Sequence, residues 1–316
     1  MRTLLLLLAF ASCACAQDYP SHAVRIVVAF PAGGGSDLAA RVVGAKLAER
    51  VGQPVVIENR VGANGGVGAE AVARAAPDGY TLMMGSNANI TTNPHLMTLA
   101  YDPMKDLAPV AMLTVNPLLM FVNPAVLPVN TFQEFLAYAK AQGPNLHYAS
   151  AGNGSPAHLC GELLKMVTGL QMVHVPYKGG PQGVHDVVGG RVGVMFAAAP
   201  TVLPQVRAGK VRGIAMTGAR RSAYAPEIPT IAESGFPDFD VVIWNALFAP
   251  SATPSAVLAK LHAEIGAVLV QPDTRELLLK QGAEPAPMEP AALRQLLQSE
   301  YARWGKVIRE ARIKVD

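Results

Sequence analysis

The sequence predicts an α/β protein made of two similar α/β units in tandem, followed by a helical C-terminal extension. Three observations lead to this prediction. Apolar, strand-like runs alternate with segments of helical periodicity along most of the chain. The order strand, glycine-rich loop, helix occurs twice, in residues 24–52 and again in residues 145–169. From residue 255 onward, the periodic segments are all helical.

The first residues indicate export from the cytoplasm. The segment MRTLLLLLAFASCACAQ contains Arg2, then a short apolar stretch, then an A-x-A pattern that ends at Ala16. This pattern is typical of a secretory signal peptide, here residues 1–16, and its apolar stretch is too short for a transmembrane helix. Lipidation at Cys13 is the less favoured alternative, because Phe10 stands where a lipobox prefers Leu.

The composition predicts a well-buried globular protein and excludes several partners. The mature chain of about 300 residues is long enough for two domains. The full sequence is 51% apolar and 16% charged, and removing Arg2 with the signal peptide lowers the formal charge from +3 to +2. Without a basic block, no nucleic-acid partner is expected. Cys160 is the one cysteine after the signal peptide, so we expect it in the core, with no intrachain disulfide. The seven histidines lack ligand spacing, so neither a metal nor a cofactor is predicted.

The first unit follows a strand–helix alternation that indicates parallel sheets built from right-handed βαβ units. We expect strands at 24–30, 54–60 and 80–86, and helices at 36–52 and 67–79. The stretch Leu107–Val129 carries no charge but contains four prolines, at positions 109, 117, 124 and 128. Because these would repeatedly break a membrane-spanning helix, short buried strands separated by turns are predicted instead, in a soluble protein.

The second unit begins with a helix at 131–143, where Thr131 and Glu134 form a capping box. Further strands are expected at 145–150, 171–177, 191–199 and 211–218, a loop and helix at 151–169, and helices at 180–190, 255–271, 273–282 and 290–312. Residues 241–254 lead into the helical C-terminal part. The apolar stretches near 108–124 and 240–250 are the expected crossings between the units. Domain 1 would then comprise residues 17–122 plus 245–316, and domain 2 residues 123–244.

Two glycine-rich loops are the candidate functional segments: FPAGGGSD, residues 30–37, and YASAGNGSPAH, residues 148–158. Each leaves main-chain N–H groups at the start of a helix, where the helix dipole favours an anion. Ligands of open α/β sheets bind at the carboxyl ends of the strands, so the two loops should face each other across a cleft. Asp37 would repel an anion, and we expect it to cap the helix at the edge of the loop.

Other functions of these loops are less favoured. Residues 152–157 fit G-x-G-x-x-A, but no acidic residue follows about 20 positions on to hold a ribose, and neither loop is a P-loop. A secreted α/β hydrolase could use Ser155 and His158, yet no G-x-S-x-G elbow surrounds any serine. Ser155 is interpreted as an N-cap or a hydroxyl donor to a ligand. For His158, ligand contact and packing in the first turn both remain open.

Several segments resemble one family, from about Tyr19 to the C-terminal helices. They are YPSHAVRIVVAFPAGGGSDLAARVV, GQPVVIENRVGANGGVGAEAVARAAPDGYTLMMG, YDPMKDLAPVAML, HYASAGNGSPAHLCGELLK, HVPYKGG and PEIPTIAESGFPDF. The chain is similar to the Bug-type substrate-binding proteins of tripartite tricarboxylate transporters, the TctC family. The resemblance implies a periplasmic-binding-protein fold of type II, in which two α/β domains joined by two hinge crossings close on a ligand. It also implies a periplasmic, non-enzymatic protein, expected as a monomer, that delivers a small carboxylate to membrane permease subunits.

The resemblance further implies which residues hold the carboxylate, largely through main-chain N–H groups and ordered water. In the first loop they are Gly33, Gly34, Gly35 and Ser36; in the second, Ala151, Gly152, Asn153, Gly154 and Ser155, with His158 just behind. The rest of the pocket would be lined by Phe30, Ser86, Tyr177, Ala198 and Trp244. Core packing stays open for Phe30, Tyr177 and Trp244.

One departure from the family pattern bears on the ligand. Where many relatives have Asp-Asn, this chain has Ala197-Ala198-Ala199, which predicts a more apolar wall and argues against an amino acid or highly polar ligand. The loops also lack Lys and Arg, which favours one or two carboxylates over three. A sensing protein that presents the same complex to a receptor remains the other alternative.

Overall fold

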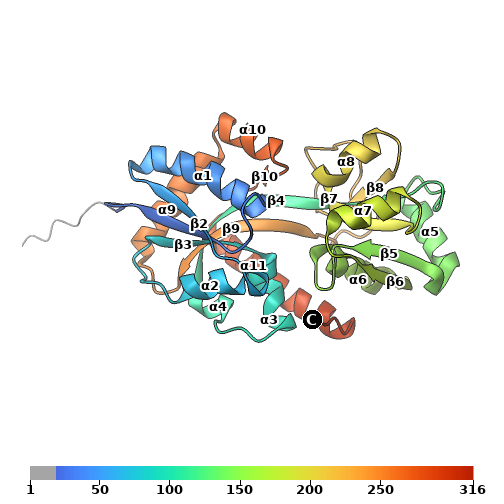
Figure 1. The fold of residues 1–316 in the computed structure, drawn as a ribbon, viewed down its shortest axis with the longest axis horizontal. Coiled ribbons are helices and arrows are strands. Elements are labelled where there is room, and N and C mark those ends of the chain that lie inside the picture. The colour runs from blue at the N-terminus through green and yellow to red at the C-terminus, as the bar shows by residue number, and fades with distance from the viewer. Residues whose placement is uncertain (1–18, 316) are drawn as a thin grey trace, which may run out of the picture.

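The computed structural model describes residues 19–315, so the predicted signal peptide and Cys13 lie outside the described residues. Two α/β halves lie side by side (Figure 1). Two long strands run from one half into the other: β4 (Leu107–Val122) and β9 (Val242–Pro250). The strands follow one continuous path, in the order β2-β1-β3-β9-β4-β7-β5-β6.

In the first half, β1 (Val24–Val28) lies between β2 (Val55–Asn59) and β3 (Thr81–Ser86), and all three are parallel. The antiparallel β9 follows β3, and β4 pairs antiparallel with β9. One face of this sheet packs on α1 (Gly35–Val51), α9 (Ser255–Leu269) and α10 (Pro272–Lys280). The other face packs on α2 (Gly66–Ala73), α4 (Pro103–Asp106) and the start of α11 (Pro290–Glu310).

The apolar stretch 107–129 differs from the prediction. Instead of short strands separated by turns, residues 107–122 form one strand of 16 residues. Its pairing with β9 shifts register next to Pro109. Pro117 is the last residue paired with β9, and from Leu118 onward β4 pairs with strands of the second half. The prolines therefore stand where regular ladder bonds are interrupted anyway, and the strand tolerates them.

In the second half, β5 (Leu146–Ser150) runs parallel to β6 (Met172–Pro176) and β7 (Val194–Ala198). The end of β4 pairs antiparallel with β7 and with β8 (Arg212–Met216). The helices are α5 (Phe132–Gln142), α6 (Pro156–Thr168), α7 (Gly180–Val188) and α8 (Ala199–Arg207). The sequence did not predict α8, whose interior Pro204 argues against a helix. As predicted, Thr131 caps α5 by accepting a hydrogen bond from the Glu134 N–H.

Several short elements connect these strands and helices. They are η1 (Ala63–Gly65), the π-helical turn η2 (Ala88–Thr92), α3 (Asn93–Leu96), η3 (Gly143–Asn145) and β10 (Glu284–Pro285). None was predicted as such, because each is shorter than the periodicity on which a prediction rests.

Helix α11 joins the two halves. Leu293 and Leu297, near its start, lie in a core cluster of the first half. Trp304 and Val307, near its end, lie in the core of the second half together with residues of α6. The predicted domain boundaries remain a prediction, since β4 and α11 each belong to both halves.

Cys160 is fully buried in the core of the second half, which confirms the packing role predicted for it. Burial raises the pKa of its thiol. Among the described residues, no helix has the length and apolar character needed to cross a bilayer.

The packing of α6 on β5 depends on Gly161. A Cβ added there would overlap the ring of Tyr148, which is fully buried and donates a hydrogen bond to Glu162. We predict that Gly161→Ala lowers the free energy of unfolding by about 1–3 kcal/mol, as overpacking of a core does.

Gly266 in α9 is the matched control, because a Cβ there meets open space. Gly266→Ala should raise stability by about 0.5–1 kcal/mol through helix propensity. Urea unfolding measures both changes, and effects of the same sign would contradict the described packing.

Candidate ligand-binding site

The first glycine loop, residues 30–36, offers fewer open N–H groups than its three glycines suggest. The Gly33 N–H donates to Asp37 Oδ2 at 2.9 Å, and the Gly34 N–H donates to the carbonyl of Pro31 at 3.2 Å. The N–H groups of Gly35 and Ser36, in the first turn of α1, are hydrogen-bonded to no described residue. The loop therefore presents these two main-chain donors at a helix start, next to the N–H of Asp37, which also has no described partner.

Asp37 holds the loop that precedes α1 and does not cap the helix as predicted, because the N-cap is Gly34 and has no side-chain hydrogen bond. Its buried carboxylate also accepts from Arg41 Nε and from Asn59 Nδ2, both at 2.9 Å. Burial alone would raise the pKa of Asp37, but the hydrogen bonds from Arg41, Gly33 and Asn59 outweigh it and lower the pKa to about 2. The carboxylate is thus ionised at neutral pH with its charge directed into the loop.

The second glycine loop, residues 151–155, has a similar division of its N–H groups. The Gly152 N–H donates to Ser150 Oγ and the Gly154 N–H donates to His158 Nδ1, both at 3.1 Å. Ser155 is the N-cap of α6, because its Oγ accepts from the His158 N–H. The N–H groups of Ala151 and Asn153 have no hydrogen-bond partner among the described residues. Like those of Gly35 and Ser36, they are open main-chain donors.

A histidine pair, with His158 buried and His174 half-buried, supports the second loop from behind. His158 stacks on His174 with ring centroids 3.7 Å apart, and His174 Nε2 lies 2.6 Å from Ser150 Oγ. Burial lowers the pKa of both histidines to about 4, aided by Lys165 for His158 and by His158 for His174. Both rings are therefore neutral at pH 7. For His158, the structure favours loop support over ligand contact.

The Ser155–His158 pair of the less favoured hydrolase alternative is not assembled. Ser155 Oγ receives the main-chain N–H of His158, while the imidazole Nδ1 of His158 is occupied by Gly154. Ser150 is closer to an imidazole, that of His174, but its side chain is fully buried and bonded within the loop. Neither serine has the exposed hydroxyl and free base that nucleophilic catalysis requires.

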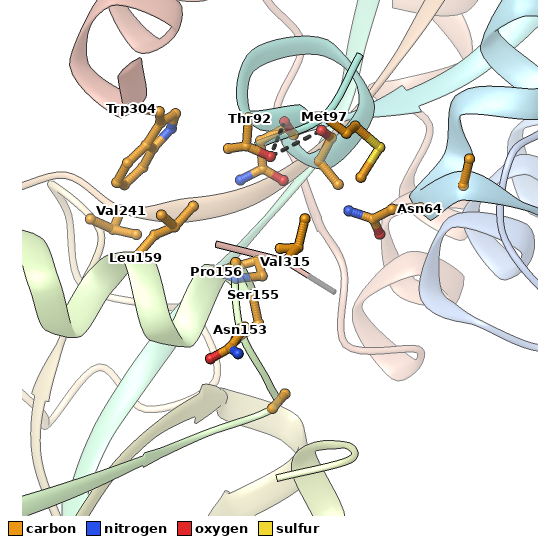
Figure 2. A pocket seen from close by; sticks show the side chains of 15 residues that line it. Asn64, Thr92, Met97, Asn153, Ser155, Pro156, Leu159, Val241, Trp304 and Val315 are labelled. Carbon is orange, nitrogen blue, oxygen red and sulfur yellow. Dashed lines mark hydrogen bonds between the residues drawn. The ribbon is translucent and has the colours of Figure 1, made fainter. Parts of the chain in front are cut away.

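A cavity of about 430 Å³ lies between the two halves (Figure 2). One wall comes from η1, the end of β3 and η2, with Asn64, Asn87, Ala88 and Thr92. The facing wall comes from the second glycine loop and α6, with Asn153, Gly154, Ser155 and Leu159. Trp304 of α11 and Val315 of the C-terminal segment also line the cavity.

A second cavity, of about 320 Å³, lies on the other side of the same loop. Ala151 and Ser155 border both cavities, and Ala198 and Ile243 line the second one. Its lining also includes Gly180 and Thr201, near the starts of α7 and α8. Of residues 19–315, none with a charged side chain lines either cavity.

The first loop lines neither cavity, but it is hydrogen-bonded to β9, the strand that contributes Ile243 to the second cavity. Ser36 Oγ donates to Asn245 Oδ1 at 2.6 Å. Asn245 lies two residues after Ile243 on β9, so the two side chains point to the same side of the strand. Asn245 was missed by the sequence analysis, although it is the polar residue in an otherwise apolar run, VVIWNALF.

The remaining predicted site residues fall in different places. Phe30 lies against Gly65 of η1, and Ser86 is buried with its N–H bonded to Asn89 Oδ1. The Tyr177 hydroxyl donates to Asp186, in a surface hollow apart from both cavities.

For Trp244, the structure favours core packing over lining the pocket, the two roles that the sequence left open. It is fully buried in the core of the first half, where its indole N–H donates to Glu300 at 2.8 Å. Successive residues of a strand face opposite sides, so Asn245 points to the glycine loop and Trp244 points away from it.

Open main-chain donors at a helix start in each half and a cavity lined by both halves are features typical of a solute-binding protein. Residues 39–313 match the family described as "Tripartite tricarboxylate transporter family receptor". Protein BugT of Bordetella pertussis is 36% identical over 95% of this chain and 92% of its own length. This chain belongs to the TctC/Bug family of periplasmic solute-binding proteins, a receptor family rather than an enzyme family.

Solved structures agree with this assignment. The R. palustris protein Rpa4515, determined with adipate, is 35% identical with a TM-score of 0.76, over 94% of this chain and 99% of that one. MatC of Rhodopseudomonas palustris, with bound malate, is 37% identical with a TM-score of 0.71, over 92% and 100%. The predicted family and fold class are therefore confirmed.

The histidine pair predicts a pH dependence of stability. Unfolded histidines bind protons near pH 6.5, whereas folded His158 and His174 stay neutral down to about pH 4. The unfolded state therefore binds more protons in this window, and stability falls as the pH is lowered from about 6.5 to about 4. For His158 alone the loss is on the order of 2 kcal/mol.

The test compares urea unfolding at pH 7 and pH 4.5. His158→Asn places an amide oxygen near the Nδ1 position, so it can keep the Gly154 bond without titrating, and it should show a smaller loss than the native protein. The exposed His147 gives the control, since His147→Asn should lose as much stability as the native protein. An unchanged loss in His158→Asn would contradict the neutral state inferred for the buried His158.

Proposed function

We propose that this protein is a periplasmic receptor that captures a small organic carboxylate between its two glycine loops and delivers it to the membrane subunits of a tripartite tricarboxylate-type transporter. The observation that carries the proposal is the pair of open main-chain N–H groups on each loop, Gly35 and Ser36 on the first, Ala151 and Asn153 on the second. The carboxylates bound by the related Rpa4515 and MatC structures support the same ligand class.

Approximate energies explain why both loops are needed. A hydrogen bond to a charged group contributes about 1.5–3 kcal/mol net, and each helix start adds roughly 0.3–1 kcal/mol. Association loses about 4 kcal/mol or more of translational and rotational freedom. Two bonds from one loop barely offset that loss, whereas four bonds from two loops leave a net gain of about 3–10 kcal/mol, a range that includes the roughly −8 kcal/mol of a micromolar complex.

The two loops belong to different halves, so tight binding requires the halves to close. We place the hinge where β4 and β9 cross between them, with residues 17–122 and 245–316 moving against residues 123–244. The ligand shifts the population toward the closed form because only that form engages both loops. A transporter that recognises the closed form would then accept loaded receptor only. We expect the receptor to act as a monomer.

The ligand carries one or two carboxylates. Two N–H groups per loop suit a single carboxylate, and no charged side chain among the described residues lines the cavities to neutralise a third acid group. Ala198 leaves the wall of the second cavity apolar.

Gly35 allows one donor to be removed selectively. It is the first residue of α1, a position that tolerates proline because its N–H has no intrahelical partner. Gly34 before it is already extended, with φ −75° and ψ 164°, as a residue before proline must be. Gly35→Pro should therefore keep the fold, remove one N–H and weaken carboxylate binding about 10- to 100-fold.

Gly35→Ala is the matched control, because it adds a Cβ in open space and keeps the N–H. Calorimetry with adipate, malate and the best ligand from a thermal-shift screen of organic acids measures the three proteins. Equal affinity of Gly35→Pro and Gly35→Ala would argue against the first loop as a carboxylate site. A native protein that binds no mono- or dicarboxylate would defeat the proposed function.

A further inference from the structure

The second cavity is connected to both glycine loops. Ala151 and Ser155 of the second loop line it directly. Ile243 of β9 also lines it, and Asn245, two residues further along that strand, accepts the hydrogen bond from Ser36 of the first loop at 2.6 Å. Alternate residues of a strand lie about 7 Å apart on one face. A carboxylate held by both loops therefore has this cavity beside it.

The accessible wall of this cavity is mainly hydrocarbon, from the half-buried or exposed side chains of Pro156, Pro181, Ala198 and Ile243. Ser155 and Thr201 contribute the two hydroxyls of the described lining. Ser155 belongs to the glycine loop and caps α6, which leaves the exposed Thr201 as the polar side chain further from the loop. A ligand group placed against this wall loses water and gains few hydrogen bonds, which favours a hydrocarbon group.

The three helices that begin at the cavity each carry a proline in their first turn. A helix start normally offers several open N–H groups to an anion. Pro156 in α6, Pro181 in α7 and Pro200 in α8 each occupy one of the first two helical positions, and each removes one N–H. The starts of α7 and α8, away from the glycine loop, are therefore poorer anion sites than ordinary helix starts.

The lining also lacks charge. Among residues 19–315, no charged side chain lines the cavity. The charged residue closest along the chain to the lining is Lys178, two residues before Gly180. Lys178 is exposed, and its strongly hydrated ammonium group sits on a flexible stem that keeps it in water. A second carboxylate in this cavity would lose its own water without meeting a cation in the wall, which is unfavourable.

We propose that the ligand is a monocarboxylic acid whose small apolar body fills the second cavity, and that Ala198 determines this specificity. The inference rests on the proposed function, which places the carboxylate at the glycine loops. The cavity volume of about 320 Å³ lies at the lower end of the range for small-molecule sites. Ala198 is the N-cap of α8 and makes no side-chain hydrogen bond there, so this position gives the ligand hydrocarbon contact alone.

Matched probes measure the preference. Hexanoate and adipate share a six-carbon chain and one carboxylate, but adipate ends in a second carboxylate where hexanoate ends in a methyl group. Calorimetry on the native protein should show hexanoate binding at least about tenfold more tightly, because the apolar wall leaves the second carboxylate unpaired. Shortening the chain from hexanoate to butanoate should weaken binding about fourfold for each methylene lost.

Ala198→Asn changes the wall without disturbing the helix. Asparagine is a preferred N-cap residue, whose Oδ1 accepts from the N–H of the second or third helical residue. Pro200 has no N–H, so the acceptor faces that of Thr201, and the Nδ2 group is left to donate into the cavity. The variant should reduce the preference for hexanoate over adipate at least about threefold. Ala208→Asn, at the exposed opposite end of α8, is the matched control and should keep the native preference.

A measurement on the native protein locates the apolar body and needs no variant to fold. With saturating hexanoate, nuclear Overhauser effects should connect its terminal methyl group to the Cδ1 methyl of Ile243, which lines the second cavity. Met97 and Val315 line the first cavity and not the second. Contacts to these two side chains in place of Ile243 would overturn the inference.

Adipate binding as tightly as hexanoate, or a preference that Ala198→Asn leaves unchanged, would overturn it as well. If a dicarboxylate binds more tightly than hexanoate and Gly35→Pro weakens that binding, this inference fails while the proposed function stands. If no carboxylate binds, both fail.

Discussion

The binding chemistry depends on which main-chain N–H groups are left without an internal partner. A buried or helix-initiating N–H needs an acceptor, and side chains supply one at selected positions only. Asp37 takes the Gly33 N–H, His158 takes that of Gly154, and Ser150 takes that of Gly152. The N–H groups that remain open are those of Gly35 and Ser36 on the first loop and of Ala151 and Asn153 on the second. The side chains that accept from the neighbouring N–H groups also fix the conformation of each loop.

The sheet determines where these donors lie. Both loops follow the carboxyl ends of parallel strands, β1 in one half and β5 in the other. Strands β4 and β9 carry the connection between the halves, and Asn245 on β9 holds the first loop through Ser36. Helix α11 adds a third connection and brings Trp304 from the C-terminal part of the chain into the cavity beneath the second loop. Any closing movement must therefore bend two strands and accommodate one helix.

Much of this arrangement could be predicted from local pattern. Alternating strands and helices, the two glycine loops, the capping of α5 and the burial of Cys160 all follow from signals within a few residues. The unbroken strand β4 could not be predicted in this way. Proline is excluded from a strand only where its missing N–H is needed for pairing, and that depends on partner strands far away in the sequence. The orientation of Trp244 and Asn245 required the register of β9. Trp304 was not singled out from the sequence, because the cavity that it lines is built from both halves and leaves no local signal.

The central claim is that main-chain N–H groups from both loops hold one carboxylate. A crystal structure of the protein with its tightest-binding organic acid tests it most directly. The account predicts carboxylate oxygens at hydrogen-bonding distance, about 2.7–3.2 Å, from the N–H of Gly35 or Ser36 and from that of Ala151 or Asn153, directly or through one ordered water. A carboxylate held by one loop alone, or by a Lys or Arg side chain, would contradict it.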